Sequence, residues 1–344
     1  MAIVLKDIAK AAGVSVGTVS DILNRGRGHL YSQETRRKVL EASRRHDYRA
    51  NRVAQAMRSN RTGIVGFATA NTTTDGMLDN QTAYPFLVGL NKRLTGAGYH
   101  VGMVELAELE QGQTVPHALK ERFYDALVIH YGLTEHAAKF ARQMGLPLIW
   151  WDSGIFLPEG CICRDETAVS SELTNRLVAM GHRRITYMVG ESGWKKYTAG
   201  ETVHYSYAQR FEAYRAAMHD HGLRERVFVG YDPETCARHL ADQKVTAMII
   251  QGVGLSIIPE ALSILGWRLG RELSVATLDR EARMDTKGPL VGGMLYDRFE
   301  TGQMAAEMVL SMLRQPQNPV SSVRIPPRFD MGDTINPILP SSSQ

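Results

Sequence analysis

One stretch near the N-terminus decides the fold of the first part of this chain, and it reads Gly13-Val14-Ser15-Val16-Gly17-Thr18-Val19-Ser20-Asp21-Ile22-Leu23-Asn24. Apolar residues recur at helical spacing both before this stretch and within it, where they are Val16, Val19 and Leu23. Gly13 can adopt the positive φ that ends a helix, and the Ser15 hydroxyl can cap the helix that follows. Two short helices joined by a tight turn predict a helix-turn-helix, which can lay its second helix in the major groove of DNA.

The distribution of charge distinguishes this segment from an ordinary helical hairpin. Residues 1–61 contain 13 Lys and Arg against 5 Asp and Glu, whereas residues 62–344 contain 27 against 31. The net charge of +4 therefore combines a basic head with a mildly acidic body. A concentrated positive face favours nucleic acid, because affinity for phosphate chains comes largely from counterion release. We expect the head to bind double-stranded DNA.

Composition indicates a cytoplasmic protein of more than one domain. A hydrophobic content of 44% with 22% charged residues is ordinary for a globular protein, and 344 residues can form a sizeable core. Neither a signal peptide nor an apolar run long enough to span a membrane is visible. The three cysteines are too few and too irregularly spaced for a disulfide framework, so reduced thiols are expected at Cys161, Cys163 and Cys236.

A third helix and a basic linker complete the head. The helix is predicted to start near Ser32 and to end near His46, with Val39, Leu40 and Ala42 packed on the first two helices. The connection 25–31 is basic and contains glycine, so it can contact phosphates, form a solvated connection, or do both. Residues 48–61 are basic and weakly amphipathic, and a segment of this kind can fold on a partner.

Three blocks of the head resemble the lactose/galactose-repressor (LacI/GalR) family. They are residues 4–20, 34–40 and 51–54, which read VLKDIAKAAGVSVGTVS, ETRRKVL and NRVA. The resemblance implies that the second helix reads bases, and that the linker folds as a hinge helix in the minor groove. Because one head buries little DNA surface, we expect a homodimer on a palindromic operator. The DNA-binding positions implied by the resemblance are Val16, Gly17, Thr18, Ser20, Asp21, Asn24, Asn51, Arg52, Ala54 and Met57.

These positions are assigned different roles. By the same resemblance, Val16, Gly17 and Asp21 would read bases, Thr18 and Ser20 would lie near phosphates, and the Met57 side chain would wedge between base pairs.

Several residues depart from the pattern of the family. Asp21 replaces the usual arginine, so a bidentate reader of guanine gives way to an acceptor that suits N4 of cytosine. Gly17 has no side chain with which to read a base. The connection 25–31 is longer than usual, and Ala50 stands where proline is common. The operator sequence is therefore not predicted from relatives.

Residues 62–340 alternate between predicted strands and predicted helices. Short apolar strands between amphipathic helices are typical of doubly wound parallel sheets covered on both faces. The length of this region exceeds one such sheet, so we expect two lobes. The expected strands are 63–70, 100–106, 126–130, 147–150, 184–189, 227–231, 247–251 and 273–278, and the expected helices are 82–96, 135–144, 166–180, 205–221, 233–241 and 255–265.

The body also resembles, more weakly, the periplasmic-binding-protein-like core of the same family. The segments that carry the resemblance are 165–187, 210–215 and 273–279. It implies a head at 1–50, a hinge linker at 51–61 and a core at 62–340 that binds an effector and forms the dimer. Lobe 1 would comprise 62–164 with 295–325 and lobe 2 would comprise 165–294 with 326–340, with chain crossings near Arg164, Met294 and Ile325.

Ligands of parallel sheets bind at the carboxyl ends of the strands, here in the cleft between the lobes. Asp152 and Asp279 are also consistent with helix caps, Arg210 with a surface position, and Trp194 with a lid residue in a loop at 191–202. The strand ends select, as candidate ligand-binding residues, Asn71, Thr72, Trp151, Asp152, Trp194 and Asp279. Arg210 joins them by the family match alone.

This set of amide, carboxylate, guanidinium and indole groups suits a sugar or related polyol. The same groups are also compatible with a carboxylated ligand or a nucleobase. Many family members carry Asn-Asp after the strand at 247–250, but this chain has Gln251-Gly252-Val253. A frequent polar ligand contact is therefore replaced.

No motif of an enzyme is found in the sequence. Gly252-Val253-Gly254 is only a fragment of a dinucleotide fingerprint, and neither a P-loop nor a metal motif is present, so no cofactor or metal is predicted. Two classes of function remain: a ligand-responsive DNA-binding repressor, which the head favours, or a cytoplasmic sugar-binding or sugar-processing protein with an incidental helical head. In the first class, an effector that prefers one arrangement of the lobes would change the affinity for DNA.

Overall fold

A computed structural model describes residues 3–24, 26–49, 56, 61–69, 83–106, 117–120, 123–130, 135–251, 254–282 and 288–338. The chain divides into two compact units. The first comprises Met1–Ile64 with Arg122–Asp125, and the second comprises Val65–Glu121 with Ala126–Gln344. None of the helices in the described ranges has the length and apolar character needed to cross a membrane.

The head contains the predicted helix-turn-helix. Gly13 ends the first helix with a φ of 65°, and the Ser15 hydroxyl oxygen accepts a hydrogen bond from the Thr18 N–H at 3.0 Å at the start of the second. Ile8, Val19 and Val39 are fully buried where the three helices meet. The helices are α1 (Leu5–Ala12), α2 (Val16–Leu23) and α3 (Gln33–Arg45), with a short 3₁₀ helix, η1 (Gly28–Leu30), before α3.

One predicted core residue of the head is wrong. Leu40 is 40% exposed, because it follows the buried Val39 by one residue and a step of one residue turns a helix by about 100°. Ala42 is buried as expected, so α3 packs through a narrower apolar face than the sequence suggested.

Two six-stranded sheets form the second unit, with strand orders β11-β5-β4-β3-β1-β2 and β12-β10-β9-β8-β6-β7. The pairs are parallel from β1 through β3, β4 and β5 to β11, and from β7 through β6, β8 and β9 to β10; β12 pairs antiparallel with β10 at one edge. The strands of the first sheet are β1 (Ile64–Thr69), β2 (His100–Glu105), β3 (Ala126–His130), β4 (Leu148–Trp151), β5 (Cys161–Arg164) and β11 (Val323–Ile325). Those of the second are β6 (Ile185–Val189), β7 (Val227–Val229), β8 (Ala247–Ile250), β9 (Ser274–Glu281), β10 (Gly292–Tyr296) and β12 (Phe329–Asp330).

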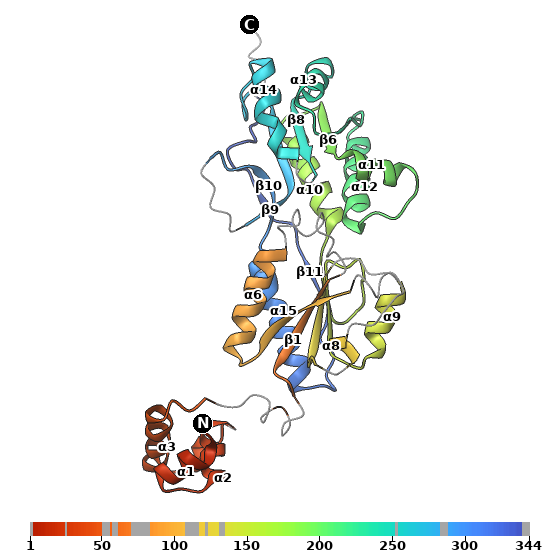
Figure 1. Cartoon of the computed structure of the whole chain (residues 1–344). Coiled ribbons are helices and arrows are strands. Elements are labelled where there is room, and N and C mark those ends of the chain that lie inside the picture. The colour runs from red at the N-terminus through yellow and green to blue at the C-terminus, as the bar shows by residue number, and fades with distance from the viewer. Residues whose placement is uncertain are drawn as a thin grey trace. The chain divides into compact units, whose positions relative to one another are not determined.

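Helices cover both faces of the sheets, so the predicted fold class of two doubly wound lobes is confirmed. Figure 1 shows α6 and α15 along one side of the first sheet and α9 along the other. The helices of the first lobe are α6 (Ala83–Gly96), α8 (His117–Lys120), α9 (Glu135–Gln143) and α15 (Arg298–Arg314). Those of the second are α10 (Glu166–Ala179), α11 (Glu191–Thr198), α12 (Tyr205–Asp220), α13 (Pro233–Asp242), the 3₁₀ helix η2 (Gly254–Ile257) and α14 (Ile258–Leu265).

The chain passes between the two sheets three times. It leaves the first sheet after Arg164, at the end of β5, and returns after Tyr296, at the end of β10. The third passage follows Ile325, at the end of β11. The first two passages place charged residues that begin α10 and α15 at the junction of the lobes.

Two glycines allow α6 and α15 to pack backbone against backbone. A Cβ added at Gly89 of α6 would come within 2.0 Å of the Phe299 carbonyl oxygen, and one at Gly302 of α15 within 2.1 Å of the Phe86 carbonyl oxygen. Because these obstacles are main-chain atoms, a side chain at either position must push the helices apart.

We therefore expect Gly89→Ala to lower the free energy of unfolding by about 3 kcal/mol, at the upper end of the usual cost of overpacking. Gly96→Ala is the matched control in the same helix, since a Cβ there meets nothing within 4 Å. Denaturant unfolding of both variants measures the difference. Equal stability of the two would show that α6 and α15 are not held at this distance.

Candidate functional site

The exposed face of α2 carries the candidate base-reading residues. Val16 is 45% exposed, and Gly17 is exposed beside it. Gly17 and Asp21 are four residues apart and therefore lie on the same side of the helix. The Asp21 carboxylate accepts a hydrogen bond of 2.8 Å from the Tyr31 hydroxyl. The candidate base-reading positions of α2 are thus an apolar residue, Val16, a glycine without a side chain, Gly17, and an acidic residue, Asp21.

The predicted phosphate-contacting residues of the head differ in exposure. The Thr18 hydroxyl lies 2.9 Å from the Ser15 hydroxyl at the start of α2. Ser20 is only 5% exposed, and its buried hydroxyl has no hydrogen-bond partner among the described residues. Asn24 is half-buried at the end of α2, where its N–H donates to the Ser20 carbonyl oxygen. The candidates Asn51, Arg52, Ala54, Met57, Asn71 and Thr72 lie outside the described residues.

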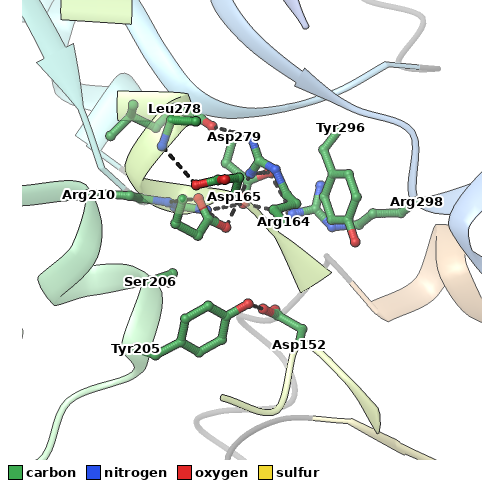
Figure 2. Close-up of polar contacts among 12 residues, drawn as sticks. Asp152, Arg164, Asp165, Tyr205, Ser206, Arg210, Leu278, Asp279, Tyr296 and Arg298 are labelled. Atoms are coloured by element: carbon green, nitrogen blue, oxygen red, sulfur yellow. Dashed lines mark hydrogen bonds and ion pairs between the residues drawn. The ribbon is translucent and has the colours of Figure 1, made fainter. Parts of the chain in front are cut away.

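A charged cluster lies at the junction of the lobes, and we call it the inter-lobe network. Figure 2 shows Arg164, Arg210, Asp279 and Arg298 converging there from separate segments. Arg210 of α12 donates two hydrogen bonds to the Glu166 carboxylate of α10, from Nε to Oε2 at 2.6 Å and from Nη2 to Oε1 at 2.8 Å. The members of the network are Arg164, Glu166, Arg210, Asp279, Glu281 and Arg298.

Asp279 of β9 is the centre of the network. Arg298, the first residue of α15, donates from Nη2 to its two carboxylate oxygens at 2.6 and 2.7 Å. Arg164 Nη1 lies 3.4 Å from Asp279 Oδ1, and Arg210 Nη2 lies 3.5 Å from Oδ2. Arg164 and Arg298 belong to segments of the first lobe, whereas Asp279 belongs to the second. The carboxylate therefore joins the two lobes.

The charges of the network balance. Glu166 is 2% exposed, and the three arginines are nearly as well buried, so none of these charges is compensated by bulk water. Burial alone would raise the pKa of the Asp279 carboxyl, but the charges of Arg298, Arg164 and Arg210 outweigh it and hold the pKa well below its usual value. Three guanidinium groups thus face three carboxylates, and the network is neutral when all are ionised.

Two further contacts connect the lobes beside the network. Trp151, at the end of β4, is 1% exposed, and its indole N–H donates to the Tyr296 hydroxyl at 2.9 Å. Asp152, with a φ of 49°, accepts a hydrogen bond of 2.6 Å from the Tyr205 hydroxyl, as Figure 2 shows. His204 Nε2 lies 3.2 Å from the Asp152 carbonyl oxygen. Both sequence-predicted residues thus have partners within the chain.

The expected loop at 191–202 is wrong, because residues Glu191–Thr198 form α11. Trp194 is half-buried on this helix and packs edge to face on Phe211, with ring centroids 5.0 Å apart. Gly193 lies within this helix, where an added Cβ would come within 2.8 Å of the Tyr207 ring. This glycine permits close packing of α11 on α12, so it does not mark a loop.

The structure brings together four of the sequence-predicted ligand candidates at the junction, Trp151, Asp152, Arg210 and Asp279, and places Trp194 against Phe211 within the second lobe. Gln251, which replaces a frequent polar contact of the family, is buried and accepts a hydrogen bond from the Tyr187 hydroxyl at 2.5 Å. The junction residues that sequence reasoning missed are Arg164, Glu166, Tyr205, Tyr296 and Arg298. Their position at or next to the lobe crossings was the available signal for Arg164, Glu166 and Arg298.

The arrangement does not resemble a catalytic centre. Each carboxylate of the network is engaged by an arginine, and within the described ranges no group of three His, Cys, Asp or Glu side chains could hold a metal ion. Cys161, Cys163 and Cys236 are free and buried. A helix-turn-helix head on a two-lobed core of doubly wound sheets defines the class of DNA-binding regulators that carry a periplasmic-binding-protein-like core.

Comparison with known families agrees with this class. The model of bacterial regulatory proteins of the lacI family matches residues 4–51, and the model of the periplasmic binding protein-like domain matches residues 174–335. The lactose operon repressor of Escherichia coli K12 is 26% identical over 328 residues, which cover 90% of this chain and 84% of that protein. The chain belongs to the LacI family. It is a DNA-binding transcriptional regulator, as its relatives are, and not an enzyme.

Solved structures show the same fold. A lac repressor dimer bound to operator and the anti-inducer ONPF has a TM-score of 0.71 at 18% identity, with 98% of this chain and all of that chain (100%) covered. A LacI-family regulator from Enterococcus faecium with bound ribose has a TM-score of 0.62 at 15% identity, with 80% and 100% covered.

Proposed function

We propose that this chain is a ligand-responsive repressor that binds a palindromic operator as a homodimer. The exposed face of α2 on a basic head carries the proposal, since a helix-turn-helix presents its second helix to the major groove. The solved lac repressor is a dimer on its operator, which supports the same assembly here. Val16, Gly17 and Asp21 would face bases, with Thr18, Ser20 and Asn24 near phosphates, and Asn51, Arg52, Ala54 and Met57 would belong to a hinge helix. Binding DNA also supports the cytoplasmic location expected from the sequence.

The domain boundaries expected from the sequence fit this proposal. A head at 1–50 and a linker at 51–61 would deliver the DNA contacts, and the core at 62–340 would hold the effector and the dimer contacts. The effector would lie in the inter-lobe cleft beside Asn71, Thr72, Trp151, Asp152, Trp194, Arg210 and Asp279.

The balanced charges of the inter-lobe network favour a neutral effector such as a sugar or related polyol. Arg210 is already neutralised by Glu166, and Asp279 by three arginines. A ligand carboxylate would have to displace Glu166 or add an uncompensated charge at a buried site, which is costly. Hydroxyl groups can instead donate to Asp279 and accept from Arg210 without changing the balance. The ribose-bound relative is consistent with this class of ligand.

Coupling between effector and DNA would act through the contacts that join the lobes. Asp279 with Arg298 and Asp152 with Tyr205 connect segments of different lobes, so a ligand among them would favour one lobe arrangement. By linkage, the free energy of that preference equals the change in affinity for DNA. A dimer would transmit it by altering the spacing of its two heads.

Footprinting of the full-length protein on the DNA upstream of its own gene tests the proposal. We expect protection of a two-fold symmetric site whose halves lie about one helical turn, or a multiple of it, apart. A protein that protects no site would contradict the regulator proposal and favour a sugar-binding role without DNA.

A thermal-shift screen of the full chain tests the effector class. We expect a neutral sugar or polyol to raise the melting temperature, and sugar acids and nucleobases to leave it unchanged. An increase caused only by carboxylated compounds or nucleobases would contradict the charge argument while leaving DNA binding untouched.

A further inference from the structure

The connection between α2 and α3 holds Asp21 by both its main chain and its side chain. The Arg27 N–H donates to the Asp21 carbonyl oxygen at 3.0 Å. The Tyr31 hydroxyl donates to Asp21 Oδ2 at 2.8 Å from the far end of the same connection, directly after η1. This is the connection that is longer than the family pattern, so a chain-specific segment contacts a position that differs from the family.

Asp21 is also the polar group on the proposed reading face. Gly17, one turn earlier on that face, has no side chain, and Val16 is apolar. A carboxylate accepts hydrogen bonds, and in the major groove the donors are the exocyclic amino groups of cytosine and adenine. Cytosine N4 is the usual partner of an acidic side chain.

A short acidic side chain that faces solvent would sample several rotamers. The hydrogen bond from the half-buried Tyr31 phenol restricts the Asp21 rotamers before the protein binds DNA. Such preorganisation reduces the entropic cost of binding. It also fixes where the carboxylate stands relative to the bases, so a wrong base is rejected more strongly.

We propose that Tyr31 is a specificity-determining positioning residue, which holds the Asp21 carboxylate toward an exocyclic amino group, cytosine N4 in the first place, in each operator half-site. The inference rests on the proposed DNA-binding function. Tyr31 need not touch DNA in this scheme; it acts through Asp21.

Selection of DNA sequences from a random pool by the full-length protein tests the inference. Four proteins are compared: the wild type, Tyr31→Phe, Asp21→Asn and the control Tyr48→Phe. Tyr48 is partly buried in the same head core, and its hydroxyl has no hydrogen bond among the described residues.

We expect the wild type to select a C·G pair at one position of each half-site. Tyr31→Phe should weaken the preference at that pair alone by about fivefold, the size of one hydrogen bond, with the salt dependence and the affinity for random DNA unchanged. Asp21→Asn should alter the same pair, and the double variant should be no worse than Asp21→Asn, since the two residues act as a unit. Tyr48→Phe should select the wild-type sequence.

Two results would overturn the inference alone: a wild-type preference at every position in Tyr31→Phe, or a loss of affinity that is uniform over all sequences. The second would mean that Tyr31 only stabilises the head. If the wild type selects no sequence, the proposed function fails, and the inference fails with it.

Discussion

Replacing Asp279 with asparagine is expected to lower the free energy of unfolding by about 3–5 kcal/mol, the usual effect of removing one partner from a buried ionic network. Asparagine keeps the shape of the side chain but removes its charge. The three arginines Arg164, Arg210 and Arg298 would then face only two carboxylates, those of Glu166 and Glu281. An uncompensated guanidinium would then remain buried at the junction of the lobes.

The matched control is Glu172→Gln on α10. Glu172 pairs with Arg176 on the helix surface at 2.7 Å, with the arginine side chain 46% exposed. Exposed pairs of this kind contribute less than about 0.5 kcal/mol. Denaturant unfolding at neutral pH measures both variants, and equal losses would show that the inter-lobe network contributes no more than a surface ion pair.

The dependence on pH follows from the lowered pKa of Asp279. A carboxyl whose pKa is lower in the folded state contributes stability above its unfolded pKa, about 3.9, and loses it as the pH falls toward the folded pKa. The free energies of unfolding of the wild type and Asp279→Asn should therefore differ most at neutral pH. The difference should begin to shrink near pH 4 and should continue to shrink as the pH falls further. A difference that stays constant down to pH 2 would mean that the ionised carboxylate is not the stabilising group.

Gly17→Ala is expected to stabilise the head and to weaken operator binding. An added Cβ would meet only the Ser15 hydroxyl oxygen, at 3.5 Å, so the protein itself does not require glycine here. Alanine is better than glycine in a helix by about 0.5–1 kcal/mol. A methyl group between the α2 backbone and the base edges would weaken the binding free energy at each half-site by about 1–3 kcal/mol, as a mismatched base pair does.

In a dimer both half-sites are affected, so the operator affinity should fall about thirtyfold or more. Thermal unfolding and operator titration of the same variant measure the two opposite effects. Gly96→Ala in α6 makes the same exchange outside the head and should leave operator affinity unchanged. Wild-type affinity in Gly17→Ala would contradict a close approach of DNA at this face.

The head was predictable from the sequence because its signals are local. Gly13 and the Ser15 cap fix the ends of adjoining helices, and Val19 and Val39 recur at positions that helical periodicity places inside. Leu40 is as hydrophobic as its neighbour Val39, but its angular position on α3 turns its side chain toward solvent.

The lobes were predictable as a class, but their junction was not. Asp279 and Arg298 are 19 residues apart and Glu166 and Arg210 are 44 apart, and only the crossings of the finished fold bring them together. Glycine was also ambiguous: Gly193 permits helix packing, whereas Gly13 ends a helix. Sequence alone does not distinguish these two uses, because the Tyr207 ring that packs against Gly193 comes from another helix.

The salt dependence of binding to the footprinted operator tests the central claim most directly. Two basic heads and their linkers should neutralise several phosphates, so the affinity of the full-length protein should fall about a thousandfold between 50 and 200 mM salt. A scrambled DNA of the same length should bind far more weakly at every salt concentration. An affinity that does not change with salt, or that is equal on the scrambled DNA, would contradict a DNA-reading regulator.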